Sequence, residues 1–229
     1  MKRKITLIVC CFIGIVCLLF ASAYYLMNAR SFQIFGGLTN QVETDELVVA
    51  LTFDDGPTEK VDAILALLDD YQAKATFFLI GKDMKNNPQQ TRKIVEAGHQ
   101  IGNHTFSHER MIFQSQQFIK QEITKTDQLI CEAGYQEEID FRPPFGKKLF
   151  GLPYYLSKHD RETITWNIEP DTAEDKLAYV QEKIEPGSII LLHPMYDQSG
   201  EELQLLEEIL QLLTSQGYSF ITVDELQNL

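Results

Sequence analysis

The stretch LVVALTFDDGP, residues 47–57, begins with a run of apolar and β-branched residues and ends with two acids and a Gly-Pro pair. A short apolar run without polar alternation is typical of a strand that is buried on both faces, as in a parallel sheet. Gly56 and Pro57 favour a turn directly after it. Asp54 and Asp55 are therefore expected at the carboxyl end of a buried strand, either as a cap before the next helix or as functional groups.

The rest of the chain repeats this unit of a short apolar run followed by a segment with helical spacing. The alternation predicts an α/β fold built on a parallel sheet in a single domain. Seven expected strands suit a distorted (β/α) barrel, one strand short of the eight-stranded type, and an open doubly wound sheet is the alternative. In both, functional groups gather at the carboxyl ends of the strands. The expected strands are residues 47–53, 74–80, 99–104, 139–144, 162–168, 188–194 and 218–223.

Two histidines follow the third expected strand in the sequence NHTFSH, residues 103–108. Their spacing puts His104 and His108 on one face of a helical turn, close enough to bind one ion, although such pairs are also common on protein surfaces. Asp54 or Asp55 would complete a three-ligand site with open positions for water and substrate. A cation bound by one aspartate lowers the cost of ionising its neighbour, which is then free to act as a base.

The N-terminal segment, residues 1–27, differs in composition from the rest of the chain. Three basic residues at positions 2–4 precede an uncharged apolar run, residues 5–27, which is long enough to cross a hydrocarbon core of ~30 Å as a helix. This run is expected to be a membrane anchor, or a signal peptide cleaved after the small residues 21–23. The chain is therefore expected at the cell membrane with its larger part outside the cytoplasm, or secreted after cleavage.

Residues 28–46 show no sustained periodicity and are expected to form a linker before a domain at residues 47–229. The chain contains 20 Lys and Arg and 33 Asp and Glu, which gives a formal net charge of −13. Because a nucleic-acid backbone would be repelled by this charge, nucleic acid is not expected as a partner. The sequence does not indicate an oligomeric state.

Four motifs follow one another at the expected strand ends: TFDDGP (52–57), HTFSH (104–108), RPPFG (142–146) and LLHP (191–194). In this order they closely resemble the polysaccharide deacetylase family, also called carbohydrate esterase family four, and the resemblance covers residues 47–223. It implies a distorted seven-stranded β/α barrel that uses a divalent metal to remove acetyl groups from N-acetylated or O-acetylated sugars. The implied metal is zinc, with cobalt or nickel as functional substitutes.

The resemblance also assigns chemical roles to single residues. The metal ligands would be Asp55, His104 and His108. Asp54 would be the general base, and Arg142 would hold its carboxylate ionised and oriented. His193 would be the general acid that protonates the leaving amine or alkoxide.

Four further residues would bind the substrate: Pro144, Phe145, Leu191 and Trp166. By resemblance, the backbone N–H of Phe145 holds the developing oxyanion, and Leu191 lines the pocket for the acetyl methyl group. Trp166, the only tryptophan, would form another wall. The sequence WNIEPDTAED (166–175) departs from the spacing of acids in the family, and Asp171 is the candidate partner for the general acid.

These assignments predict an exported, metal-dependent deacetylase of an extracellular or cell-wall polysaccharide. The preferred substrate is an N-acetylglucosamine-containing glycan such as peptidoglycan. One alternative is a catalytically silent carbohydrate-binding or morphogenetic protein on the same fold, and another is a hydrolase of non-sugar amides. A set of two histidines and one carboxylate is also found in non-haem Fe(II) sites, so the ligands alone do not identify the metal.

Overall fold

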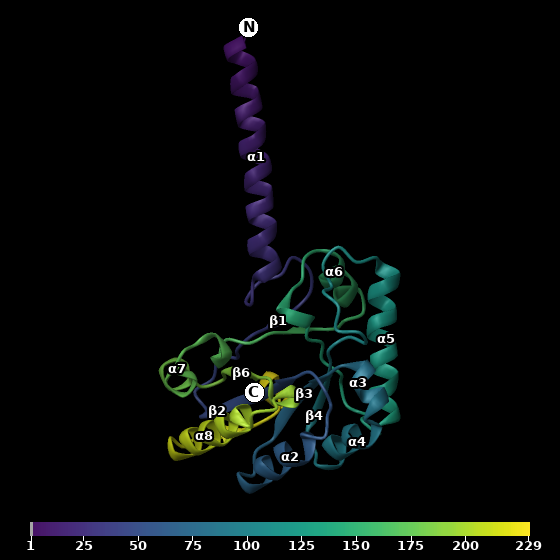
Figure 1. Ribbon diagram of the computed structural model, residues 1–229, viewed down its shortest axis with the longest axis vertical. Coiled ribbons are helices and arrows are strands. Elements are labelled where there is room, and N and C mark those ends of the chain that lie inside the picture. The colour runs from purple at the N-terminus through teal and green to yellow at the C-terminus, as the bar shows by residue number, and fades with distance from the viewer. Residues whose placement is uncertain (1) are drawn as a thin grey trace.

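The computed structural model describes residues 2–229, so Met1, the first residue of the expected 1–27 segment, lies outside the described part. Helix α1, Lys2–Asn28, is one continuous helix that projects away from the rest of the protein (Figure 1). An 18-residue window within Arg3–Asn28 has a mean hydropathy of 2.8, and the helix is long and apolar enough to cross a membrane. The same length and composition also suit a signal sequence.

A parallel sheet forms the centre of the domain, with β2, Val48–Asp54, in its middle. β2 pairs with β3 on one side and with β6 on the other, so that Thr52 lies beside Thr76 and Leu191. Nearly all of β2 is buried, which suits its apolar and β-branched sequence. The strand order is β4-β3-β2-β6, and β7 also pairs with β2. These other strands span Ala75–Leu79 (β3), Gln100–Asn103 (β4), Ile189–Leu192 (β6) and Ser219–Phe220 (β7).

Within residues 2–229 the strands form two sheets and no continuous closed ring. The second sheet contains β1, Leu38–Thr39, and β5, Thr163–Ile164, again parallel. Single bridges at Phe141 and Ile168 connect the two sheets. The expected α/β domain with a parallel sheet is therefore confirmed, whereas a closed seven-stranded barrel is not.

Three of the expected strands are much shorter than expected: residues 218–223 form only the two-residue β7, and the other two are short for identifiable reasons. In residues 139–144, the adjacent Pro143 and Pro144 lack the N–H groups that a strand ladder needs. In residues 162–168, the backbone changes its partner partway along. The N–H of Thr165 donates to β1, whereas the N–H of Asn167 donates to β6.

Residues 38–42, from the segment expected as a linker, lie between β5 and the beginning of β6. The N–H of Thr165 donates to the carbonyl of Thr39 at 2.8 Å, and the N–H of Val42 donates to the carbonyl of Gly187 at 3.0 Å. This segment therefore contributes backbone pairing to the domain that follows it.

Helices surround the central sheet, with α2, α4 and α8 along its lower side and α3 and α5 to its right in Figure 1. Leucine and isoleucine recur in α8 at spacings of three and four, and this stripe packs into the core. The helices are α2 (Val61–Asp70), α3 (Gly81–Asn86), α4 (Pro88–Glu96), α5 (Gln116–Glu132), α6 (Gly151–Lys158), α7 (Lys176–Lys183), α8 (Glu201–Ser215) and α9 (Val223–Gln227). Short 3-10 turns lie at Pro144–Gly146 (η1), Pro170–Thr172 (η2) and Pro194–Tyr196 (η3).

The strand ends bring the sequence motifs to one edge of the sheet. β2 ends at Asp54, β4 ends one residue before His104, and β6 ends one residue before His193. Because these strands are parallel and close in the sheet, their carboxyl ends lie at the same edge.

Candidate active site and metal centre

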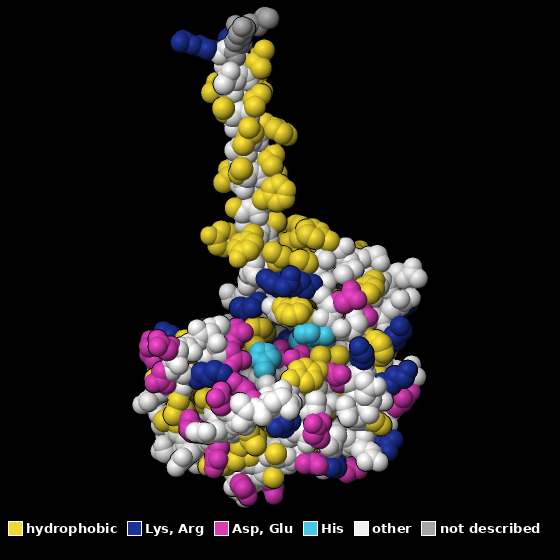
Figure 2. Space-filling view, viewed as in Figure 1, with side chains coloured by type: hydrophobic (Ala, Val, Ile, Leu, Met, Phe, Trp, Pro, Cys, Tyr) yellow, Lys and Arg dark blue, Asp and Glu magenta, His cyan; other side chains and the backbone are white. Residues whose placement is uncertain are grey.

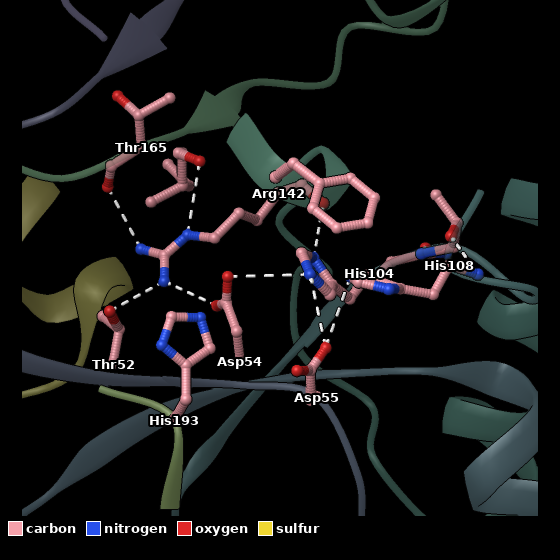
Figure 3. Close-up of polar contacts among 12 residues, drawn as sticks. Thr52, Asp54, Asp55, His104, His108, Arg142, Thr165 and His193 are labelled. Carbon is pink, nitrogen blue, oxygen red and sulfur yellow. Dashed lines mark hydrogen bonds and ion pairs between the residues drawn. The ribbon is translucent and has the colours of Figure 1, made fainter. Parts of the chain in front are cut away.

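The three expected metal ligands, Asp55, His104 and His108, lie together just beyond the ends of β2 and β4 (Figure 3). One possible ligand atom from each lies within 4.8 Å of the other two. Asp55 Oδ1 is 3.3 Å from His108 Nε2 and 3.9 Å from His104 Nε2. Two ligands bound at tetrahedral angles to zinc are about 3.3 Å apart, so these atoms need only a small adjustment to share one ion.

The surroundings of these side chains fit a divalent cation. His104 Nδ1 is 2.8 Å from the carbonyl oxygen of Arg142. An N–H at Nδ1 donates to that oxygen and leaves the Nε2 lone pair facing Asp55, which is the usual arrangement of a metal-ligating histidine. Asp55 Oδ1 is buried and has no hydrogen-bond partner among the described residues. Burial and the neighbouring His104 lower the pKa of His108, which favours its neutral, ligating form.

The loop between the two histidines is held by buried polar side chains. Asn103 Oδ1 accepts a hydrogen bond from the N–H of Thr105 at 2.8 Å. Glu122, on α5, accepts three hydrogen bonds with one oxygen: from the N–H of Phe106 at 3.1 Å, and from the N–H and the hydroxyl of Ser107, each at 2.8 Å. Glu122 therefore positions the loop that carries both imidazoles.

Replacing Glu122 with alanine is expected to weaken metal binding about 10- to 100-fold, as is usual when a group that orients metal ligands is lost. The N–H groups of Phe106 and Ser107 would lose their acceptor, and the loop would become less ordered. Glu122→Gln is the matched control, since its amide oxygen can still accept. Competition titration of Zn²⁺ against a chromogenic chelator measures the affinities, and equal values for alanine, glutamine and the parent would contradict this role.

Asp54 lies beside the ligand cluster, and its carboxylate is held by a different partner. Arg142 Nη1 donates to Asp54 Oδ1 at 2.8 Å, and both side chains are buried. Asp54 Oδ2 faces the ligands, 3.6 Å from His104 Nε2 (Figure 3). Burial alone would raise the pKa of Asp54, but Arg142, followed by His104 and His193, outweighs it and lowers the pKa below its usual value. The carboxylate is therefore ionised at neutral pH, as a general base must be.

Arg142 is itself fixed on several sides. Its guanidinium donates to Thr52 Oγ1 at 2.7 Å, to the carbonyl of Thr165 at 3.1 Å and to the carbonyl of Ile164 at 3.4 Å. The guanidinium carbon Cζ also lies 4.0 Å from the centre of the Phe78 ring. A guanidinium restrained in this way holds the paired carboxylate in one orientation.

His193 follows β6 and lies beside Asp54 in Figure 3. Its Nδ1 is 2.9 Å from Asp171 Oδ2, which is the pairing expected from the sequence. Burial alone would lower the pKa of His193, but the hydrogen bond to Asp171 and the charges of Asp54 and Asp55 outweigh it and raise the pKa to about 9. The imidazole is therefore protonated at neutral pH, as a general acid must be.

Replacing Asp171 with asparagine is expected to move the alkaline limb of the pH–rate profile to lower pH by about one unit or more. A raised pKa keeps His193 protonated below about 9, and the acid form is lost as the pH rises through that value. Without the negative charge of Asp171 the proton is lost at lower pH. Glu174→Gln, an exposed neighbour in the same segment, is the control with the same change in charge. A pH profile of kcat that is unchanged by Asp171→Asn would disprove this coupling.

The turn η1 forms the rim of the site beside His108. Phe145 has a φ of 60°, in the left-handed region that non-glycine residues seldom adopt. Its ring centre is 4.7 Å from that of His108, and the guanidinium of Arg110 packs 5.1 Å from the ring centre. Pro144, the first residue of this turn, is buried. Phe145 therefore contacts a candidate ligand directly.

Leu191 and Trp166 belong to one apolar cluster next to the site, and both are almost completely buried. Trp166 Nε1 donates to Glu169 at 2.9 Å, and the guanidinium carbons of Arg30 and Arg142 lie 4.3 and 5.4 Å from the centre of its ring. Neither Leu191 nor Trp166 exposes enough surface to form more than the floor of the site. Their contact with substrate stays a prediction.

Arg30 is a neighbour of the site that its sequence does not predict. Its guanidinium donates to the carbonyl of Gly146 at 3.0 Å and to that of Phe145 at 3.4 Å, which braces η1 from outside. Nothing in the local sequence singles it out, because it lies in an irregular segment far along the chain from its partners. Glu122 did carry a signal, since an acid interrupts the apolar stripe of Ile119 and Ile123 on α5.

The family model described as polysaccharide deacetylase matches residues 41–164, which is more than half of the chain. The match includes the candidate ligands, Asp54 and Arg142, and ends before His193.

Curated relatives extend over most of the chain. A peptidoglycan-N-acetylglucosamine deacetylase of Bacillus cereus is 32% identical over 199 residues, which cover 83% of this chain and 93% of that protein. The peptidoglycan-N-acetylglucosamine deacetylase PgdA of Listeria monocytogenes is 31% identical over 190 residues. Here the alignment covers 78% of this chain and 38% of the relative, so the chain spans less than half of the length of PgdA.

Solved structures agree with the sequence relatives. A peptidoglycan N-acetylglucosamine deacetylase in complex with 4-naphthalen-1-yl-N-oxidanyl-benzamide has a TM-score of 0.77 and 29% identity, covering 83% of this chain and 92% of that one. A pseudoenzyme of carbohydrate esterase family four from Bacillus anthracis has a TM-score of 0.73 and 28% identity, covering 84% and 69%. By its fold, its motifs and these matches, the chain belongs to the polysaccharide deacetylase family.

Proposed function

We propose that this protein is a metal-dependent hydrolase that removes acetyl groups from a cell-wall polysaccharide, with N-acetylglucosamine in peptidoglycan as the preferred substrate. The observation that carries the proposal is the meeting of Asp55, His104 and His108 beside a separate carboxylate, Asp54, which Arg142 keeps ionised. Family membership and the names of the relatives support the reaction and the substrate class.

In this proposal the two neighbouring aspartates have different roles, one as a metal ligand and the other as the general base. Asp55, His104 and His108 would hold the divalent ion, with zinc preferred and cobalt or nickel as substitutes. A metal in this position would polarise the acetyl carbonyl and make a nearby water easier to deprotonate. Asp54 accepts the proton of that water through its Oδ2, since its Oδ1 is occupied by Arg142. The resulting nucleophile attacks the acetyl carbon.

Two further groups act as the acetyl carbon becomes tetrahedral. The backbone N–H of Phe145, on the braced turn η1, donates to the developing oxyanion. His193, held by Asp171, then gives its proton to the leaving nitrogen or oxygen, and acetate and a free sugar amine or hydroxyl are released. The positions of Asp54 and His193 beside one another suit a base and an acid that serve the same bond.

The site would work outside the cytoplasm. The basic residues at positions 2–4 and the apolar α1 suit either a retained anchor or a cleaved signal, and both export the domain. We infer that α1 is retained at the cell membrane, because its apolar run continues through Tyr24–Met27 beyond the small residues at 21–23.

The test is acetate release by the full-length protein from peptidoglycan, chitooligosaccharides and acetylated xylan. We expect release from the N-acetylglucosamine glycans, its loss in the presence of a chelator, and its recovery with Zn²⁺. Comparison of acetate release from re-N-acetylated and from O-acetylated peptidoglycan shows whether the enzyme cleaves the amide or the ester bond of the acetyl group. Because one of the similar structures is that of a pseudoenzyme, an absence of activity would also be informative. Tight Zn²⁺ binding without acetate release from any of these glycans would favour a catalytically silent carbohydrate-binding protein.

A further inference from the structure

The C-terminal end of α1 is joined to the catalytic domain by direct contacts. The N–H of Lys148 donates to the carbonyl of Met27 at 3.3 Å, and the Lys148 ammonium donates to the carbonyl of Ala29. The Lys147 ammonium donates to the side chain of Asn28. Because these contacts begin in the last turn of α1, no free spacer separates the helix from the domain. The direction of α1 therefore sets the orientation of the domain.

Exposed apolar side chains gather at this junction. Figure 2 shows hydrophobic atoms around the foot of α1, next to the face on which histidine side chains are visible. We define the junction patch as the exposed side chains of Phe32, Ile34, Phe35, Phe150 and Tyr154. They come from two separate segments, and the rings of Phe35 and Tyr154 meet edge to face at 5.6 Å between centres. A cluster of exposed apolar side chains is typical of a surface that contacts another protein or a membrane.

The length of α1 places the junction patch at the boundary of a bilayer. Counting from Ile5, the first residue after the basic positions, about 20 helical residues at about 1.5 Å each cross a core of about 30 Å. This span ends at Tyr24 and Tyr25, which are exposed, and tyrosine is common at the edge of the hydrocarbon core. The junction patch follows immediately, and α6 lies at the level of the last turns of α1 in Figure 1.

Cations surround the same junction in a chain whose net charge is −13. Arg30 and Arg110 both contact Phe145 in η1, and Lys147 and Lys148 follow that turn in the sequence. Their proximity is also evident from the pKa of Lys147, which burial and these two arginines lower. A positive region on an acidic protein complements the anionic headgroups of a bilayer surface.

We propose that the junction patch lies in the headgroup region of the bilayer that α1 spans, so that the domain rests on the membrane and its active-site rim faces the lipid surface. The occupant of the patch is a bilayer that contains anionic lipids. The contacts at Met27, Asn28 and Ala29 fix this orientation, and Lys148 is buried within them. The apolar side chains enter the interface, and the exposed Arg110 and half-buried Arg30 and Lys147 face the headgroups. This position of the domain on the bilayer does not depend on the proposed deacetylation, because it follows from the contacts of α1 and from the exposed side chains at the junction.

Depth-dependent fluorescence quenching tests the placement. The full-length chain, with its four native cysteines replaced by alanine, receives one cysteine for a bimane probe, at Tyr154→Cys or at the control Ser215→Cys. Ser215 is exposed at the end of α8, away from α1. Both variants are reconstituted in vesicles of phosphatidylglycerol and phosphatidylcholine that carry a nitroxide in the headgroup.

The probe at residue 154 is expected to lose most of its fluorescence, and the probe at residue 215 very little. Equal, weak quenching at both sites would overturn the proposal, because the domain would then stand clear of the bilayer. A probe at Phe35→Cys provides a second position from the other segment of the patch and should be quenched like residue 154. Quenching at residue 154 without quenching at residue 35 would also contradict it, because the two side chains are neighbours.

Discussion

Replacing Asp54 with asparagine is expected to slow acetate release by about 10²- to 10⁴-fold, because a neutral amide cannot accept a proton from water. The substitution changes the shape very little, and the amide oxygen can still accept the hydrogen bond that Arg142 donates at 2.8 Å. The fold and the ligand cluster are therefore expected to persist. The measurement is the initial rate of acetate release at saturating Zn²⁺.

The Zn²⁺ affinity of the same variant separates a base from a ligand. If Asp54 is the base, the affinity stays close to that of the parent while the rate falls. A parallel loss of affinity would instead make Asp54 a ligand. Asp62→Asn is the matched control, because Asp62 is an exposed aspartate that pairs with Lys93 on the surface, and it should retain full activity. Release by Asp54→Asn at the parent rate would rule out the assigned role.

Replacing Asp55 with alanine is expected to abolish both Zn²⁺ binding and acetate release. Asp55 is the only carboxylate in the three-ligand cluster, and its Oδ1 lies 3.3 Å from His108 Nε2. Loss of a group that only orients a metal ligand lowers the metal affinity about 10- to 100-fold. Loss of a direct ligand should lower the affinity further. Competition titration measures the Zn²⁺ affinity. After treatment with a chelator, excess Zn²⁺ should restore acetate release by the parent protein but not by the variant.

Stability in chelator distinguishes loss of a ligand from loss of the fold. Asp55 Oδ1 is buried without a hydrogen-bond partner among the described residues, so the metal-free protein contains an uncompensated acceptor there. Asp55→Ala removes that acceptor. The melting temperature without metal is therefore expected to equal or exceed that of the parent. Retention of both zinc and activity by the variant would refute the ligand assignment.

The sequence predicted which candidate side chains lie together, because they belong to short motifs at strand ends. Asp54 and Asp55 are adjacent, His104 and His108 are four residues apart, and parallel strands bring these pairs to one edge. Asp171 was expected as the partner of His193 by resemblance to an acid of the family motif, despite its altered spacing, and the two side chains are 2.9 Å apart.

The parts that could not be predicted depend on contacts between distant segments. Arg30 braces η1 across 116 positions of the chain, and no local pattern reports such a contact. The distorted seven-stranded barrel was expected because the number of strand segments can be read from a sequence, whereas the pairing between strands cannot. Pro143 and Pro144 in one of these segments, and a change of hydrogen-bond partner after Thr165 in another, reduce the ladder to single bridges.

Strand β1 affects how the domain can be produced in isolation. The family match begins at residue 41, after β1, so a shortened protein that starts there would lack the acceptor that Thr39 offers to Thr165. The edge of β5 that normally pairs with β1 would then be exposed, and its free backbone groups could pair with a strand of another molecule. Recombinant versions that begin at the family boundary should therefore precipitate more readily than versions that begin before Arg30.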